Sequence, residues 1–177
     1  MDAEGKAVEI RPARDDELDR AGELAACAFS RLRSLLTPEN WLVMQERIRF
    51  TTAEDTLGCL LVAVFAGEIV GSVRYTGAGH GGHVIYPDRF AYVRSLAVSL
   101  EHPRRGIGRS LTEACIEAAR QDGAEAIGLH VAEANTAARR LYEQLGFRFY
   151  RQAPAYFGLP YLAYCLRFAS KAQDIHA

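Results

Sequence analysis

A short run rich in glycine and arginine is the part of the chain best suited to chemistry. It comprises the consecutive residues Arg104, Arg105, Gly106, Ile107, Gly108, Arg109 and Ser110. Where a strand passes through glycines into a helix, backbone N–H groups face one concavity and the helix dipole adds partial positive charge. Glycine lets a ligand approach the backbone, and arginine suits phosphate groups. The run therefore predicts a phosphate site at the start of a helix.

Two further polar residues share one face of a helix expected downstream. Asn135 lies seven residues before Tyr142, a spacing of about two helical turns that puts both on the same side. Asparagine is equally suited to cap the N-terminus of that helix. For Tyr142, the alternative to a functional role is that of an aromatic residue that simply packs in the core. Both interpretations of each residue stay open on spacing alone.

The glycine spacing does not fit the two common phosphate motifs. A dinucleotide fingerprint needs a third glycine three residues after Gly108, and a P-loop needs Gly-Lys followed by Ser or Thr. Several expected strands precede the turn, whereas a dinucleotide fold usually places its glycine turn first. The alternative that the glycines only start a helix also remains at this point.

The chain of 177 residues has the length and the apolar content of one folded domain. We expect a single domain over residues 1–177, with a core at 6–169 and a frayed tail at 170–177. The net charge of −1 argues against general affinity for nucleic acid or acidic membranes. A basic site must therefore be local, and we expect neither kind of partner.

Cysteines and histidines give no sign of a metal site. Cys27, Cys59, Cys115 and Cys165 are scattered without paired spacing, which predicts reduced core thiols and no zinc site. The loop 77–83 contains two histidines, but the glycines around them give a metal no fixed geometry. Charges interrupt the first stretch of the chain, and no run reaches the ~20 apolar residues of a membrane span. We expect a cytoplasmic protein without a bound metal.

Alternating and helical spacings of apolar residues predict an α/β chain. Strands are expected over residues 7–12, 59–65, 69–75, 90–98, 126–131, 147–151 and 161–168. Helices are expected over residues 15–32, 38–48, 106–121 and 135–145. A right-handed crossover makes the strands at 90–98 and 126–131 parallel neighbours. A loop with Pro154, Gly158 and Pro160 is expected between the last two strands.

With these features in place, the chain resembles the GNAT superfamily of N-acetyltransferases over roughly residues 8–168. The matching residues are Leu96-Ala97-Val98, Arg104 to Leu111, Leu129, Val131, Asn135, Ala138, Leu141-Tyr142 and Leu145-Gly146-Phe147. The resemblance implies a GNAT-like α/β (α+β) fold, with a mixed, strongly bent sheet of about seven strands and helices on both faces. The splayed parallel strand pair would hold the cofactor.

The same resemblance implies acetyl-CoA as the acyl donor. Its pantetheine arm would pair with the backbone of one strand, and its pyrophosphate would occupy the glycine turn. The implied cofactor-binding residues are Leu96, Ala97, Val98, Arg104, Arg105, Gly106, Ile107, Gly108, Arg109, Ser110, Asn135 and Tyr142. Pro103 departs from the family pattern, because proline has no N–H to donate to a phosphate. We expect Arg104 and Arg105 to compensate.

The catalytic residues are assigned from the resemblance as well. Tyr142 matches the family's tyrosine and is implied to protonate the departing thiolate, since a phenol of pKa ~10 is protonated at neutral pH. Tyr92 and Arg94 stand where members often have a Glu or His base, and Tyr92 is the second candidate catalytic residue. Ordered water, His130 or Glu133 could instead take the proton, although His130 is expected to point away from its apolar strand neighbours. Arg94 hints at an acceptor that carries a carboxylate.

The implied reaction is acetyl transfer to a primary amine by direct attack in a ternary complex. The acceptor would be a small molecule or a peptide amine, such as a protein N-terminus or lysine. The alternatives are a catalytically weak acyl-CoA-binding sensor, suggested by the missing carboxylate base, and a nucleotide-binding fold. Specificity is expected to depend on irregular segments after Ser30, around 77–87 and near 156–161. The long final strand could pair with a second copy to form a homodimer.

Overall fold

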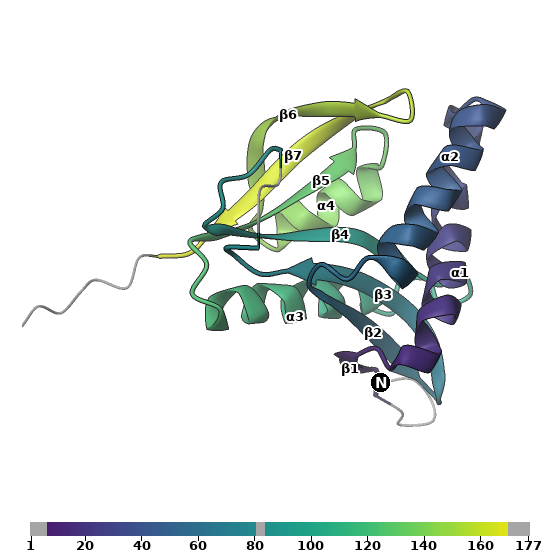
Figure 1. Ribbon diagram of the computed structural model, residues 1–177, viewed down its shortest axis with the longest axis horizontal. Coiled ribbons are helices and arrows are strands. Elements are labelled where there is room, and N and C mark those ends of the chain that lie inside the picture. The colour runs from purple at the N-terminus through teal and green to yellow at the C-terminus, as the bar shows by residue number, and fades with distance from the viewer. Residues whose placement is uncertain (1–6, 81–83, 170–177) are drawn as a thin grey trace, which may run out of the picture.

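The computed structural model describes residues 7–80 and 84–169 (Figure 1). The expected tail at 170–177 and residues 81–83 of the histidine-containing loop lie outside the described residues, as do residues 1–6. Across the described part of the chain, no helix combines the length and the apolar character that crossing a membrane requires.

The strands of the described chain form one mixed sheet in the order β1-β2-β3-β4-β5-β7-β6. They are β1 (Glu9–Pro12), β2 (Cys59–Phe65), β3 (Glu68–Thr76), β4 (Phe90–Val98), β5 (Ala126–Ala132), β6 (Arg148–Tyr156) and β7 (Leu159–Arg167). β4 and β5 run parallel, and every other neighbouring pair is antiparallel. The predicted sheet of about seven strands and its parallel pair are confirmed.

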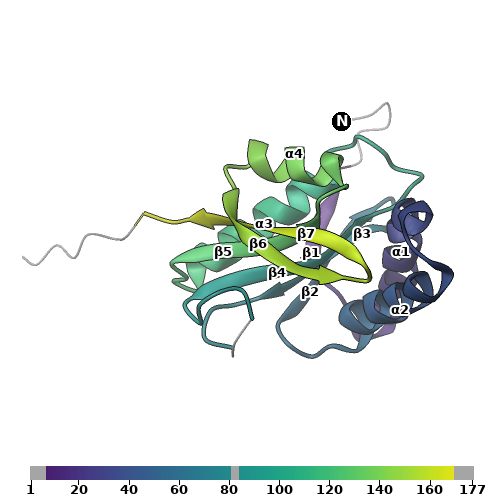
Figure 2. The ribbon, with the colours of Figure 1, turned by 90° about the horizontal axis from the view of Figure 1, so that it is seen from above.

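Helices cover both faces of this sheet. They are α1 (Leu18–Ala28), α2 (Pro38–Arg49), α3 (Ile107–Gln121) and α4 (Thr136–Gln144). α3 and α4 pack on one face, with Leu111 and Tyr142 in the core, and α1 and α2 pack on the other face, with Leu24 and Met44 in a second core (Figure 2). The helix expected over 15–32 ends at Ala28, because the chain tightens into a 3-10 segment after it.

β4 carries one extra residue near its centre. Ser72 of β3 lies opposite Ala97, and two residues further along β3, Arg74 lies opposite Arg94. Three steps along β4 therefore match two steps along β3. Ser95 has a φ of 52°, in the left-handed region that residues other than glycine seldom adopt. This is a β-bulge, which bends the strand and shifts the alternation of its side chains by one residue.

The bulge marks the point at which β4 and β5 separate. Their parallel pairing begins with Phe90 opposite Ala126. It ends with Val93 opposite Leu129. Beyond Val93, no strand of the described chain pairs with the edge of β4 that faced β5. The backbone N–H and C=O groups along that edge can therefore bind a ligand that carries amide groups.

The last two strands form a long hairpin, and the irregular loop expected between them was wrong. β6 continues to Tyr156, which pairs with Leu159, so that Phe157 and Gly158 alone make the turn (Figure 1). Phe157 and Gly158 have φ values of 55° and 79°, which suit a two-residue turn matched to the twist of the strands. Pro154 lies at an irregularity in the register of β6, where strands tolerate proline.

β7 is an interior strand of the sheet. It lies between β5 and β6 and pairs with both of them. The expected pairing of a second copy along the final strand is therefore wrong, because neither edge of β7 is open. The outer edge on this side of the sheet belongs to β6.

The cysteines occupy different environments. Cys115 and Cys165 are buried as predicted, and Cys59 is half-buried. Cys27 is exposed, because it lies on the side of α1 that faces away from the core, unlike its buried neighbour Ala26. The prediction of a core thiol was therefore wrong for Cys27.

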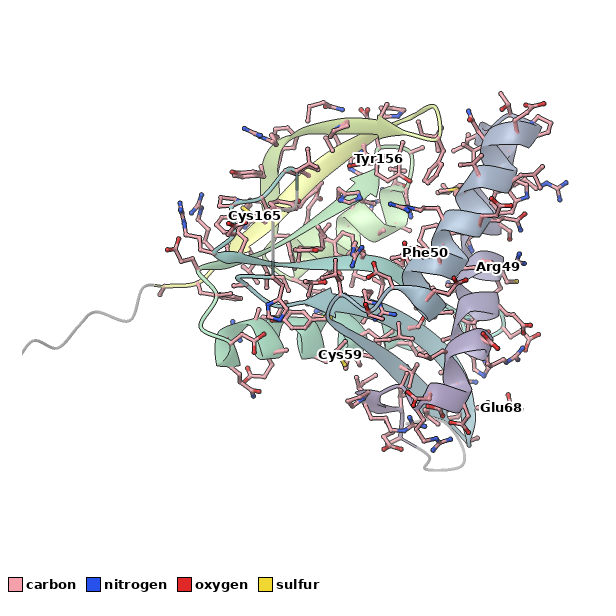
Figure 3. All side chains as sticks on the ribbon, viewed as in Figure 1. Arg49, Phe50, Cys59, Glu68, Tyr156 and Cys165 are labelled. Atoms are coloured by element: carbon pink, nitrogen blue, oxygen red, sulfur yellow. The ribbon has the colours of Figure 1, made fainter. Side chains whose placement is uncertain are left out.

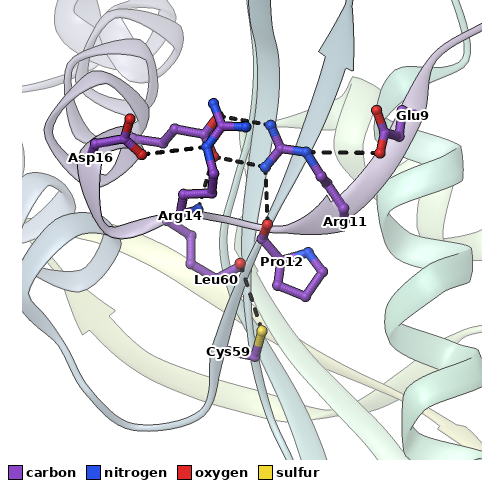
Figure 4. A network of polar contacts seen from close by, with 8 residues as sticks. Glu9, Arg11, Pro12, Arg14, Asp16, Cys59 and Leu60 are labelled. Carbon is purple, nitrogen blue, oxygen red and sulfur yellow. Dashed lines mark hydrogen bonds and ion pairs between the residues drawn. The ribbon is translucent and has the colours of Figure 1, made fainter.

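A network of polar contacts that includes Arg11 and Arg14 connects β1 to the start of α1 (Figure 4). Glu17 accepts hydrogen bonds at 2.7 Å from both Nη atoms of Arg11 and at 2.8 Å from the backbone N–H of Arg14. The Arg11 hydrogen bonds and then the Arg14 N–H lower the pKa of Glu17 to about 2. This edge of the sheet is therefore held in place by an ionised carboxylate.

Candidate active site

The glycine turn lies where β4 passes into α3. Gly106 caps α3 with a φ of 74°, and a Cβ built on it would meet no atom within 4 Å. Glycine is therefore favoured here by the positive φ, because a side chain at this position would have enough space. The first N–H groups of any helix lack intrahelical acceptors, so those of Ile107 and Gly108 are available to an anion.

The three arginines of the turn differ in their surroundings. The guanidinium of Arg105 lies 5.0 Å from the centre of the Phe65 ring. Arg109 donates a hydrogen bond to Gln144 Oε1 at 3.1 Å and pairs with Glu113 at 3.6 Å. Arg104 is exposed and has a φ of 58°. Arg105 and Arg109 thus already interact with residues of β2, α3 and α4. Arg104 is therefore the arginine of the turn that is best placed to contact a ligand.

A groove of about 250 Å³ runs from this turn along the open edge of β4. Leu96, Ala97 and Val98 form one wall, and the next wall is formed by Gly108, Asn135, Ala137, Ala138 and Leu141. The opposite wall comes from the end of α1 and the 3-10 segment, including Arg31. Sequence reasoning missed Arg31, and the only signal was the irregular stretch expected after Ser30.

The groove meets a cavity of about 80 Å³ where β4 and β5 separate. Its lining includes Arg94, Ser95, Leu96, His130, Tyr142 and Tyr161. Asn135, Leu96 and Ala138 belong to both the groove and the cavity. The structure thus brings together the predicted residues of β4 and α4, with the bulge between them.

Tyr142 reaches the cavity from within the core. It is 6% exposed, and its ring centre lies 5.8 Å from that of Phe147. Burial raises the pKa of its hydroxyl above the ordinary value near 10, with a smaller contribution from Cys115. Tyr142 therefore stays protonated throughout the neutral range, and the core packing fixes the position of its ring.

Asn135 has the capping role that its residue type allowed. Its Oδ1 accepts a hydrogen bond from the backbone N–H of Ala138 at 3.2 Å at the start of α4. The same residue lines the groove and the cavity, so capping and ligand contact are compatible.

The second face of β4 carries Tyr92 and Arg94. Tyr92 is 7% exposed, and its ring centre lies 5.3 Å from the Arg94 guanidinium carbon. Arg94 pairs with Asp55, at 2.8 Å between Nη1 and Oδ2. The lining of the cavity includes Arg94 and does not include Tyr92 among the residues described. Tyr92 and Tyr142 therefore belong to the two different cores, on opposite faces of the sheet.

His130 points away from the apolar side of β5, as predicted. Its ring centre lies 5.0 Å from that of Tyr156, labelled in Figure 3, and 5.8 Å from that of Tyr161. Glu133 is exposed. Tyr156 and Tyr161 both contact His130, whereas Tyr150 packs against Tyr86 and Phe90.

No group of three or more potential metal-ligating side chains gathers within residues 7–80 and 84–169. The Nδ1 of His80 lies 3.2 Å from the Ala78 carbonyl oxygen, and its companion in the loop falls among the residues that are not described.

Comparison with known proteins agrees with this architecture. A family model described as "Acetyltransferase (GNAT) family" matches residues 22–147. A mycothiol acetyltransferase of Propionibacterium freudenreichii subsp. shermanii is 33% identical over 137 residues, which are 76% of this chain and 41% of that protein. The matches to two other curated relatives cover 28% and 20% of their lengths. The chain therefore spans less than half the length of these relatives.

Solved structures show the same fold. The yncA protein of Salmonella typhimurium, solved with its cofactor acetyl-CoA, gives a TM-score of 0.64 at 21% identity over 94% of this chain and 96% of that one. The ribosomal-protein-S18-alanine N-acetyltransferase of Escherichia coli gives a TM-score of 0.68 at 18% identity over 97% of this chain and 100% of that one.

Proposed function

Because the chain belongs to the GNAT family of acetyltransferases, we propose that it transfers an acetyl group from acetyl-CoA to a primary amine in a ternary complex. The observation that carries this proposal is the continuous path from the glycine turn, along the open edge of β4, to the cavity that contains Tyr142. The path has a phosphate-binding end and a reactive end, as a long acyl carrier requires. We also propose a cytoplasmic location, with which the free cysteines are compatible.

The donor would lie along this path. Its pyrophosphate would accept hydrogen bonds from the first N–H groups of α3, with Arg104 and Arg31 close by. Its pantetheine amides would pair with the unpaired edge of β4 at Leu96 to Val98, as an added strand does. The thioester would then enter the cavity between the bulge and Tyr142.

In the reaction, the amine nitrogen attacks the thioester carbonyl, a C–N bond forms, and the C–S bond breaks. A backbone N–H near Leu96 would stabilise the negative charge that develops on the carbonyl oxygen. Tyr142 would donate a hydrogen bond to the departing sulfur, which leaves as a thiolate and takes up a proton. The amine loses one proton to a base.

We assign the base to His130. It lines the cavity from β5, and an imidazole is the side chain best suited to accept a proton near neutral pH. Glu133 is exposed, which favours His130 between the two residues. For Tyr92 we propose a positioning role, in which its ring supports the Arg94 guanidinium.

Turnover tests this function against the alternative of an acyl-CoA sensor. Purified protein is incubated with acetyl-CoA and a panel of primary amines, and free CoA is measured. Amine-dependent release of CoA supports the enzyme. If acetyl-CoA raises the melting temperature but no amine releases CoA, the chain is an acyl-CoA-binding module instead. Stabilisation by ATP or NAD without stabilisation by CoA would refute both.

A further inference from the structure

Arg94 is only partly satisfied where it borders the cavity. Its Nη1 binds Asp55, but its Nε and Nη2 are buried and have no hydrogen-bond partner among the described residues. A guanidinium carries five N–H donors and usually binds a carboxylate through two of them. Buried charged donors are normally paired. Because Arg94 lines the cavity, a ligand that enters it can become the missing partner after the side chain changes rotamer.

The charge around Arg94 points the same way. Arg74 lies opposite it on β3, 4% exposed, and donates to the carbonyl oxygens of Thr51 at 3.0 Å and Thr52 at 2.6 Å. Arg74 and Arg94 are thus two guanidinium groups that share one carboxylate, Asp55. One positive charge in this shielded cluster remains uncompensated, and a bound anion would offset it.

The position of Arg94 relates this anion to the reaction. Arg94 and Leu96 flank the bulge at Ser95, so their Cα atoms lie closer together than the roughly 7 Å that two steps of an extended strand would give. Arg94, His130 and Tyr161 line the same small cavity as Tyr142. An anionic group held by Arg94 would therefore lie only a few bonds from an amine that attacks beside Leu96.

We propose that the acceptor is a small amine that carries a carboxylate within a few bonds of its nitrogen, and that the Arg94 guanidinium binds this carboxylate. This inference rests on the proposed acetyltransferase function and names its acceptor class. Tyr161 and Tyr156, packed around His130, would enclose the short chain between the two groups.

Matched acceptor pairs test the proposal. Glycine is compared with glycinamide, and β-alanine with its carboxamide, by the kcat/KM for release of CoA. We expect the wild type to prefer each carboxylate at least about tenfold, since an Arg–carboxylate hydrogen bond is charge-assisted. Arg94→Gln should remove most of the preference, because it should raise the KM for the carboxylates far more than the KM for the amides. Arg120→Gln, an exposed arginine of α3, is the control and should keep the preference.

A second measurement separates failure of the subsite from failure of the enzyme. Propionate and propanamide are added to the acetyl-CoA-loaded protein, and the melting temperature is recorded. Stabilisation by propionate alone, lost in Arg94→Gln and partly kept in Arg94→Lys, supports the subsite even if no amine turns over. Equal kcat/KM for carboxylates and amides, equal stabilisation by both additives, or preference for long peptides whatever their nearby charge would overturn it.

Discussion

Replacing Tyr142 with phenylalanine removes one oxygen atom from the reactive cavity and keeps the ring packed against Phe147. The ordinary pKa of a thiol is near 8.5 and that of a phenol is near 10. Burial raises the pKa of Tyr142 further, so complete proton transfer to the thiolate is uphill by more than about 2 kcal/mol. The main contribution of Tyr142 is therefore a hydrogen bond to the sulfur as its negative charge develops.

A hydrogen bond to a charged group contributes about 1.5–3 kcal/mol. Tyr142→Phe should accordingly lower kcat by roughly 10- to 150-fold. The KM for acetyl-CoA should change little, because the bond strengthens only as the thiolate forms. Since Tyr142 stays protonated in the neutral range, its ionisation should not lower the kcat of the wild type there. The kcat of the wild type and of the variant should therefore depend on pH in the same way over this range.

The assay is steady-state release of CoA, together with the melting temperature in the presence and absence of acetyl-CoA. An acetyl thioester of a more acidic thiol should restore most of the lost rate, because its leaving group needs less stabilisation. Tyr150→Phe is the matched control, since Tyr150 packs against Tyr86 and Phe90 outside the cavity. An unchanged kcat in Tyr142→Phe, or a loss that an acidic leaving group does not repair, would refute the assignment.

Other perturbations test the base, the turn and the N-terminal ion pair. His130→Gln should lower kcat by about 100-fold, because an amide side chain cannot accept the amine's proton; an unchanged kcat would argue for water as the base. Gly106→Ala should cost about 1–2 kcal/mol in unfolding, since its φ of 74° is unfavourable for alanine, and should raise the KM for acetyl-CoA. The pKa of Glu17 is lowered to about 2 in the folded protein, so its contribution to stability is complete above pH ~4.5 and is lost as the pH falls towards 2. Glu17→Gln should therefore lower the melting temperature at pH 7 and flatten its decline in acid, and parallel melting curves for the two proteins would contradict this.

The elements that position the site follow from local sequence signals. Apolar periodicity placed β4, α3, β5 and α4 within a few residues of their observed bounds, because each one buries one side against the same core. The glycines of the turn and the cap at Asn135 are equally local, since each depends on neighbours within one helical turn. Such features need no knowledge of distant contacts.

The features that remained hidden depend on residues far apart in the chain. Nothing in the sequence near Arg94 indicates that Asp55 would pair with it, or that its Nε and Nη2 would be buried without a hydrogen-bond partner among the described residues. No glycine in the sequence indicates the bulge at Ser95, which is recognised only from the register of β4 with β3. In the hairpin, the prolines indicated a loop, whereas the turn depends on Phe157 adopting a positive φ.

The extra residue in β4 divides one strand into two units that can diverge separately. Tyr92 and Arg94, before Ser95, face the α1 and α2 side, whereas Leu96 to Val98, after it, line the groove of the donor. Substitutions in the first half can change which amine is accepted. The second half would still bind the donor, because it does so through backbone groups to which side chains contribute little. A strand built in this way lets new acceptor specificities evolve on an unchanged donor site.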